Sequence, residues 1–144
     1  MAAESRTDKT GLSELLNLTI PADVEALGEV TDAISAHLER LIVPEQKRME
    51  IALAVQEALV NAVVHGCKGD RTKSVNCRME GDANGRIVIT VSDPGPGFNP
   101  ETLPDPQQAE RVYRDHGRGV YLIRQLMDEV QFERGGREIR MWKY

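Results

Sequence analysis

Aromatic residues and cysteine are both scarce in this chain. Phe, Trp and Tyr make up 4% of the 144 residues, so Ala, Val, Leu and Ile must supply most of the core. The two cysteines, Cys67 and Cys77, form no CxxC pair and have no histidine at zinc-finger spacing. This pattern argues against a structural zinc site and predicts two free thiols in a reducing, cytoplasmic setting.

Long apolar runs and an excess of positive charge are also missing. No apolar stretch approaches the length that spans a bilayer, and the polar start MAAESRTDKTG lacks the apolar centre of a signal peptide. The formal net charge is −5, whereas binding of nucleic acid by phosphate neutralisation needs a basic face. We therefore expect no direct contact with membrane or nucleic acid, although an acidic total leaves room for a local basic patch.

The order of predicted elements indicates one α+β domain. Strands are expected at 13–21, 74–80, 86–93, 130–134 and 138–144, and helices at 22–43, 45–65 and 117–128. Strands grouped in pairs favour a mixed, mostly antiparallel sheet with the three helices packed on one face. Residues 1–12 are expected to be disordered, and 13–144 to form the single domain.

Each predicted helix carries apolar residues at helical spacing, which predicts the side that it turns to the core. These stripes are Val24, Leu27, Val30, Ile34, Leu38 and Leu41 in the first helix, Ile51, Val55, Leu59 and Ala62 in the second, and Val120, Ile123 and Met127 in the third. The segment 94–116 is rich in proline and has no sustained apolar period. A loop of this length without structure of its own is often functional.

Three polar residues line one face of the second predicted helix. Glu57, Asn61 and His65 are spaced four apart in EALVNAVVHG. Taken alone, this spacing is most typical of an ordinary polar helix face. The chemical interpretation gives Asn61 a neutral oxygen for Mg²⁺ and makes Glu57 a general base, with His65 structural. A zinc site is disfavoured, because Asn is a poor zinc ligand and no cysteine joins the group.

A glycine motif, DPGPGF, directly follows the predicted strand IVITVS. Asp93 at the strand end could accept hydrogen bonds from an exocyclic amino group. Gly95 and Gly97 have no side chains, so the backbone there can pass close to a flat ligand. An ordinary Pro-Gly turn explains the same letters, and the motif is weak in isolation.

A second glycine pair opens the third predicted helix, HGRGVYLIRQLM. Gly117 and Gly119 lie where free amide groups and the helix dipole favour a phosphate. Arg114 and Arg118 could add positive charge, since guanidinium matches phosphate oxygens. Solvated arginines beside a simple glycine turn are the alternative.

Other nucleotide and hydrolase motifs are absent. The chain has no GxxxxGK[ST], which excludes a P-loop, and no GxSxG nucleophile elbow. The stretch GPGFNP has proline where a dinucleotide fingerprint needs its third glycine, and no helix begins there.

The motifs together, in this order and at these separations, resemble the N, G1 and G2 boxes of the GHKL ATPases. That superfamily includes sensor histidine kinases, type II topoisomerases, Hsp90-like chaperones and MutL-like repair proteins. The short chain, EALVNAVVHG and GRGVYLIRQLMDEV are most similar to the anti-sigma-factor serine kinases of the RsbW and SpoIIAB type. The resemblance covers nearly the whole chain from about Ser13, and it implies a two-layer α/β sandwich of the Bergerat kind.

This resemblance implies ATP and Mg²⁺ as cofactors and assigns a role to each motif residue. Asn61 would hold Mg²⁺ against the phosphates, and Glu57 would be the base that activates a protein serine. Asp93 would bind the adenine amino group, with Gly95 and Gly97 beside the ring.

The third motif and the segment before it would serve the phosphates. Gly117 and Gly119 would support them at the helix start, and 99–116 would be the ATP lid. Either Arg114 or Arg118 would neutralise the γ-phosphate, and the sequence leaves the choice open. The chain contains no phosphoacceptor-histidine hairpin, which argues against a complete sensor kinase.

The resemblance implies a serine protein kinase that is also an anti-sigma factor. Members of this family usually act as homodimers that sequester an RNA polymerase sigma factor and phosphorylate an antagonist protein on serine. Three alternatives stay open: a nucleotide-gated binding module without kinase activity, a switch kinase that activates a phosphatase, and an interaction domain that has lost nucleotide.

Overall fold

The computed structural model describes residues 11–94 and 118–144. Residues 1–10 and 95–117 lie outside the described part, and with them most of the predicted disordered start and the whole predicted lid. The elements are β1 (Ser13–Pro21), the 3₁₀ turn η1 (Val24–Ala26), α2 (Leu27–Arg40), α3 (Glu45–Asn61), the π-helical turn η2 (Ala62–Gly66), β2 (Ser74–Gly81), β3 (Ile87–Ser92), α5 (Arg118–Leu126), β4 (Glu129–Glu133), the 3₁₀ turn η4 (Arg134–Gly136) and β5 (Glu138–Lys143).

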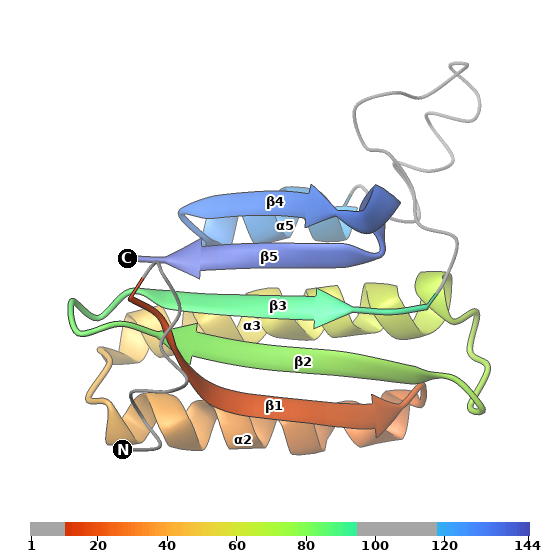
Figure 1. Cartoon of the computed structure of the whole chain (residues 1–144), viewed down its shortest axis with the longest axis horizontal. Helices are drawn as coiled ribbons and strands as arrows, with labels where there is room; N and C mark the ends of the chain where they lie inside the picture. Colours follow the sequence, from red (N-terminus) through yellow and green to blue (C-terminus); the bar gives the residue numbers. More distant parts are fainter. Residues whose placement is uncertain (1–10, 95–117) are drawn as a thin grey trace.

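The strands form one sheet in the order β1-β2-β3-β5-β4 (Figure 1). Every neighbouring pair among these described strands is antiparallel, so the predicted parallel component of the sheet is wrong. The chain passes from β1 to β2 through α2 and α3, and from β3 to the edge strand β4 through α5. The hairpin after β4 then brings β5 back between β4 and β3, antiparallel to both. The predicted two-layer α+β architecture is confirmed.

The three helices cover a single face of the sheet. Figure 1 shows α3 between α2 and α5, all behind the five strands. The predicted stripes of the second and third helices are buried throughout, as expected for residues that share one side of a helix. Within residues 11–94 and 118–144, no helix combines the length and apolar character needed to cross a bilayer.

The predicted stripe of the first helix is correct in its centre and wrong at both ends. Leu27 to Leu38 contribute buried side chains, whereas Val24 and Leu41 are exposed. Asp23 accepts a hydrogen bond from the Glu25 amide at 3.0 Å and starts a 3₁₀ turn, so α2 itself begins only at Leu27. Outside the helix, helical spacing no longer decides which way a side chain faces.

A buried lysine at the end of β5 ties the helix layer to the sheet. Lys143 is 8% exposed, and its Nζ donates a hydrogen bond to Glu50 Oε2 on α3 at 2.9 Å and another to the Leu126 carbonyl at the end of α5. Because α5 packs along α3, the two hydrogen bonds of Lys143, one of them an ion pair with Glu50, join the end of α5 to α3 as well as to the sheet.

Removing the carboxylate of this pair should destabilise the fold. We expect Glu50→Ala to lower the free energy of unfolding by about 1–3 kcal/mol, because the buried ammonium keeps only a carbonyl partner. Urea unfolding measures the change. Gln56→Ala, an exposed change on the same helix, should stay within about 0.5 kcal/mol of the wild type. Equal stability of the two variants would show that the pair contributes nothing.

Candidate functional site

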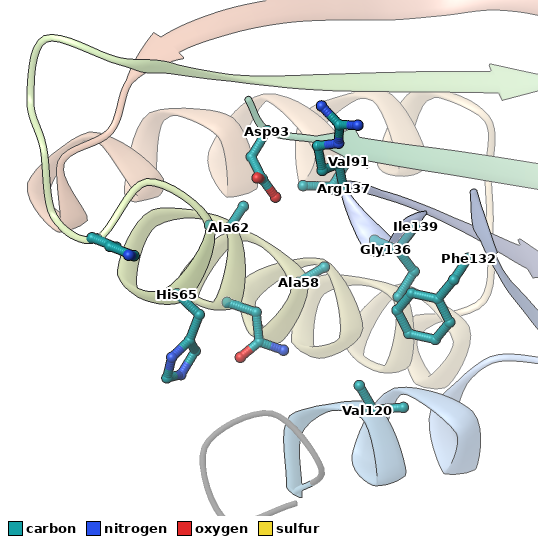
Figure 2. Close-up of a pocket in the computed structure, with 13 residues that line it drawn as sticks. Ala58, Ala62, His65, Val91, Asp93, Val120, Phe132, Gly136, Arg137 and Ile139 are labelled. Carbon is teal, nitrogen blue, oxygen red and sulfur yellow. The ribbon is translucent and has the colours of Figure 1, made fainter. Parts of the chain in front are cut away.

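A cavity of about 250 Å³ opens where the end of α3 and η2 meets the end of β3, the start of α5 and the β4–β5 hairpin. Its polar lining residues are Asn61, His65, Lys68, Asp93 and Arg137, and its apolar ones include Ala58, Ala62, Val91, Val120, Phe132 and Ile139. Figure 2 shows Val120 and Phe132 toward one side of the view, and Asp93 away from them with its carboxylate pointing toward the helix at Ala62. The cavity therefore combines apolar walls with a carboxylate and two cationic side chains.

Asp93 reaches the cavity because the helix end beside it has no side chain. Its backbone amide donates to the Arg137 carbonyl at 2.9 Å, which fixes the residue to the neighbouring hairpin. On the other side lies Gly66, where an added Cβ would come within 2.6 Å of Asp93 Oδ2 and overlap the rest of the carboxylate. Only glycine at 66 lets the helix end and this carboxylate meet.

Asn61 and Gly119 form a second contact of the same kind. A Cβ at Gly119 would lie 2.8 Å from Asn61 Nδ2, so the missing side chain lets the first turn of α5 close on the amide. Asn61 belongs to α3, which connects this contact to the one at Gly66 a single turn later. The two glycines thus place an amide and a carboxylate at one cavity.

The chain between these two contacts leaves α-helical geometry. The Cys67 amide bonds the Ala62 carbonyl at 2.8 Å, a separation of five residues, in place of the continuous α-helix predicted to His65. Such π turns often occur at functional sites, because the wider turn redirects side chains locally. His65, which we expected to be structural, lies in this turn and lines the cavity.

Both cysteines are buried, and neither is bonded to another cysteine. Burial, together with the negative charge of Asp93, raises the pKa of the Cys67 thiol. Burial alone raises the pKa of Cys77 to about 12. Both thiols are therefore protonated and poorly nucleophilic at neutral pH, and the predicted free thiols are confirmed.

The structure brings together three of the predicted site residues, Asn61, Asp93 and Gly119. Glu57 is half-buried one turn before Asn61 on α3, and it does not line the cavity. Arg118 is the first residue of α5. The remaining predicted residues, Gly95, Gly97, Arg114 and Gly117, lie outside the described part of the chain.

Several lining residues had no signal in the sequence. Lys68 follows the π turn, and Phe132, Arg137 and Ile139 come from the β4–β5 hairpin. The hairpin meets the site because β5 pairs with β3, with Val91 opposite Ile139. A hairpin pattern predicts that two strands pair with each other, but it does not predict which central strand they join.

A family model for the histidine kinase-like ATPase domain matches residues 20–143. The chain belongs to this family. The match takes in α3, β3, α5 and the β4–β5 hairpin, and so every element that lines the cavity of this histidine kinase-like ATPase domain.

Named relatives extend the similarity over most of the chain. A serine-protein kinase RsbW from Bacillus subtilis (strain 168) is 27% identical over 139 residues, covering 92% of this chain and 86% of that protein. A protein of the same name from Staphylococcus aureus (strain Newman) is 29% identical over 139 residues, covering 91% and 87%. These names agree with the predicted resemblance to anti-sigma-factor serine kinases.

Solved structures support the fold of the domain. A crystal structure of the RsbU and RsbW domains of a Mycobacterium tuberculosis protein matches 91% of this chain with a TM-score of 0.61 at 16% identity. This chain spans 32% of that one. The histidine kinase domain of the Erythrobacter litoralis EL346 blue-light activated histidine kinase matches 85% with a TM-score of 0.51 at 23% identity, and this chain spans 59% of it.

The contact between Gly66 and Asp93 can be tested by adding one methyl group. We expect Gly66→Ala to lower the free energy of unfolding by about 1–3 kcal/mol, because the carboxylate or the helix end must move. Thermal unfolding measures this change. Gly28→Ala is the matched control, since nothing lies within 4 Å of its added Cβ on α2. It should stabilise the helix by up to about 1 kcal/mol. A Gly66→Ala protein as stable as that control would contradict the close packing.

Proposed function

We propose that this chain is a cytoplasmic, ATP- and Mg²⁺-dependent serine protein kinase that also acts as an anti-sigma factor. In this proposal it phosphorylates an antagonist protein on serine and sequesters an RNA polymerase sigma factor. The observation that carries the proposal is the pair of glycine contacts, which brings Asn61 and Asp93 from distant motifs to one cavity in a histidine kinase-like ATPase domain. The names of the relatives support the serine as acceptor.

The lining of the cavity fits a nucleotide. Val91, Ile139 and Ala62 offer apolar surface to a flat base, and the Asp93 carboxylate can accept a hydrogen bond from an adenine amino group. Lys68 and the start of α5, a helix of nine residues, supply positive charge and free amides for phosphates. Gly95, Gly97 and Gly117 remain predicted contacts of the nucleotide, on the ground of the resemblance to the GHKL motifs.

The fit for Mg²⁺ depends on one side chain. Among the described residues, no group of three or more His, Cys, Asp or Glu side chains could hold a metal. Asn61 offers a neutral oxygen, which suits an ion that keeps most of its waters and takes its other ligands from phosphates. The contact with Gly119 holds this amide in place.

ATP with Mg²⁺ would supply the phosphoryl group and neutralise its charge. Glu57 would accept the proton of the serine hydroxyl, a step that needs the carboxylate within hydrogen-bond reach of the substrate. Arg114 or Arg118 would neutralise the γ-phosphate. Phosphoryl transfer needs positioning and charge neutralisation more than covalent help, so this small set of groups is sufficient.

Nucleotide affinity is the first test of the proposal. Calorimetry with and without Mg²⁺ should show Mg²⁺-dependent ATP binding by the wild type. Asp93→Asn should bind about tenfold to a hundredfold more weakly, because it loses a hydrogen bond to an ionised acceptor. Asp70→Asn, an exposed change on the loop after η2, is the control and should bind like the wild type. Failure of the wild type to bind ATP would overturn the kinase assignment.

Phosphotransfer tests the role of Glu57. With radiolabelled ATP, the wild type should label a protein on serine in an extract of the source organism, and the labelled protein can then be purified as the substrate. Glu57→Gln should slow transfer by about 10²- to 10⁴-fold, because it removes a general base. The control Asp70→Asn should be unaffected, because Asp70 is exposed on the loop after η2. Since Glu57 does not line the cavity, a nucleotide-gated binding module is the second candidate function, and ATP binding with no labelled protein would favour it.

A further inference from the structure

The solvent-facing side of α3 and η2 carries an apolar stripe. Met49, Leu53 and Val64 are 65%, 42% and 44% exposed, and Val60 between them is half-buried. Their spacing of four, seven and four residues places them on one side of the helix. We call these four residues the α3 stripe. At a rise of 1.5 Å per residue it is about 22 Å long.

An apolar outer stripe is unusual for a helix in this position. The apolar residues of α2 and α5 are concentrated on one side of each helix, whereas those of α3 lie both on its core side and on its solvent side. The core side is already occupied by Ile51, Val55 and Leu59, which are fully buried. A helix that is apolar on both sides is normally covered on both, so the α3 stripe indicates a contact with another molecule.

The position of Glu57 connects the stripe to the proposed chemistry. At about 100° per residue, Glu57 lies about 40° around the helix axis from Leu53 and about 60° from Val60. Asn61 lies about 40° further in the same direction, where the cavity begins. Around the axis of α3, the α3 stripe is therefore followed by the Glu57 carboxylate, then by the Asn61 amide and then by the cavity.

This order separates the two reactants. The carboxylate of Glu57 is half-buried and lies outside the cavity that fits the nucleotide, so the group that it serves must approach from the solvent side. A protein that brings a serine hydroxyl to Glu57 from that side has its flanking residues over Leu53 and Val60. Glu57 also lies near the middle of the stripe, eight residues after Met49 and seven before Val64.

We propose that the α3 stripe is the docking surface for the protein substrate, whose phosphoacceptor serine is flanked by apolar side chains. This inference rests on the proposed function and names the part of the domain that recognises its substrate. Contacts away from the reacting atoms supply the binding that holds the hydroxyl against the base. They should therefore set the KM for the protein substrate and leave the nucleotide site unchanged.

The test replaces the apolar side chains and measures each substrate separately. The probe is the purified serine-bearing protein that the wild-type chain labels from radiolabelled ATP. Met49→Asp with Leu53→Asp should raise its KM about tenfold or more, as expected when central interface residues are lost. The kcat at saturation and the affinity for ATP should stay within about twofold, because neither residue lines the cavity. Leu53→Gln alone should give a smaller rise in the same direction.

Matched controls separate docking from folding. Val24→Asp changes a side chain that is 58% exposed but lies outside α3, and its KM should equal that of the wild type. Leu53→Met keeps an apolar surface and should also keep the wild-type KM. Circular dichroism melts show whether each variant is folded, and Leu53→Gln provides the test if the double variant is not.

Each remaining outcome decides against the docking surface. An unchanged KM in folded variants that still bind ATP would overturn it and leave the proposed kinase intact. If the variants had a lower mass than the wild type in sedimentation and an unchanged KM, a second copy of the chain would cover the α3 stripe in place of the substrate. If the wild type binds ATP but labels no protein, both the kinase assignment and this inference fail.

Discussion

The site depends on one close approach, between the end of η2 and the carboxylate that follows β3. The hydrogen bond of its amide to the Arg137 carbonyl fixes Asp93 to the neighbouring hairpin, and its carboxylate lies against Gly66. Any larger residue at that position would push the helix away from the sheet edge. Because Asn61 lies on the same helix, the approach also sets how far the amide is from the carboxylate, and with it the shape of the cavity.

Helix α3 contacts both the sheet and the neighbouring helix α5. Ile51 and Val55 on the core side of α3 hold it to the sheet, Glu50 bonds the lysine that ends β5, and Asn61 faces the first turn of α5. The residues that make these contacts point in different directions around the axis of α3. A rotation of the helix that changed one contact would therefore disturb the others. Core packing of α3 therefore helps to set the direction in which Asn61 faces, together with the contacts within the site.

Much of this arrangement could be predicted from local sequence, because its signals are local. Repeats such as Ile51 and Val55 mark a helix side, and glycine motifs placed Asn61 and Asp93 in one site through their resemblance to a known family. The part played by Arg137 could not be predicted, since it follows from the pairing of β5 with β3, which no neighbouring residue encodes. The apolar periodicity of the sequence likewise extends to Leu41, although α2 ends at Arg40.

The π turn has a consequence for how this stretch of chain can vary in length. Its wide hydrogen bond, from the Cys67 amide to the Ala62 carbonyl, accommodates one residue more than an α-helical turn would. Losing a single residue between them would restore ordinary helical spacing and rotate everything that follows by about 100°. Gly66 would then no longer face Asp93. The geometry of the turn therefore fixes the number of residues from Ala62 to Cys67 as well as the glycine at 66.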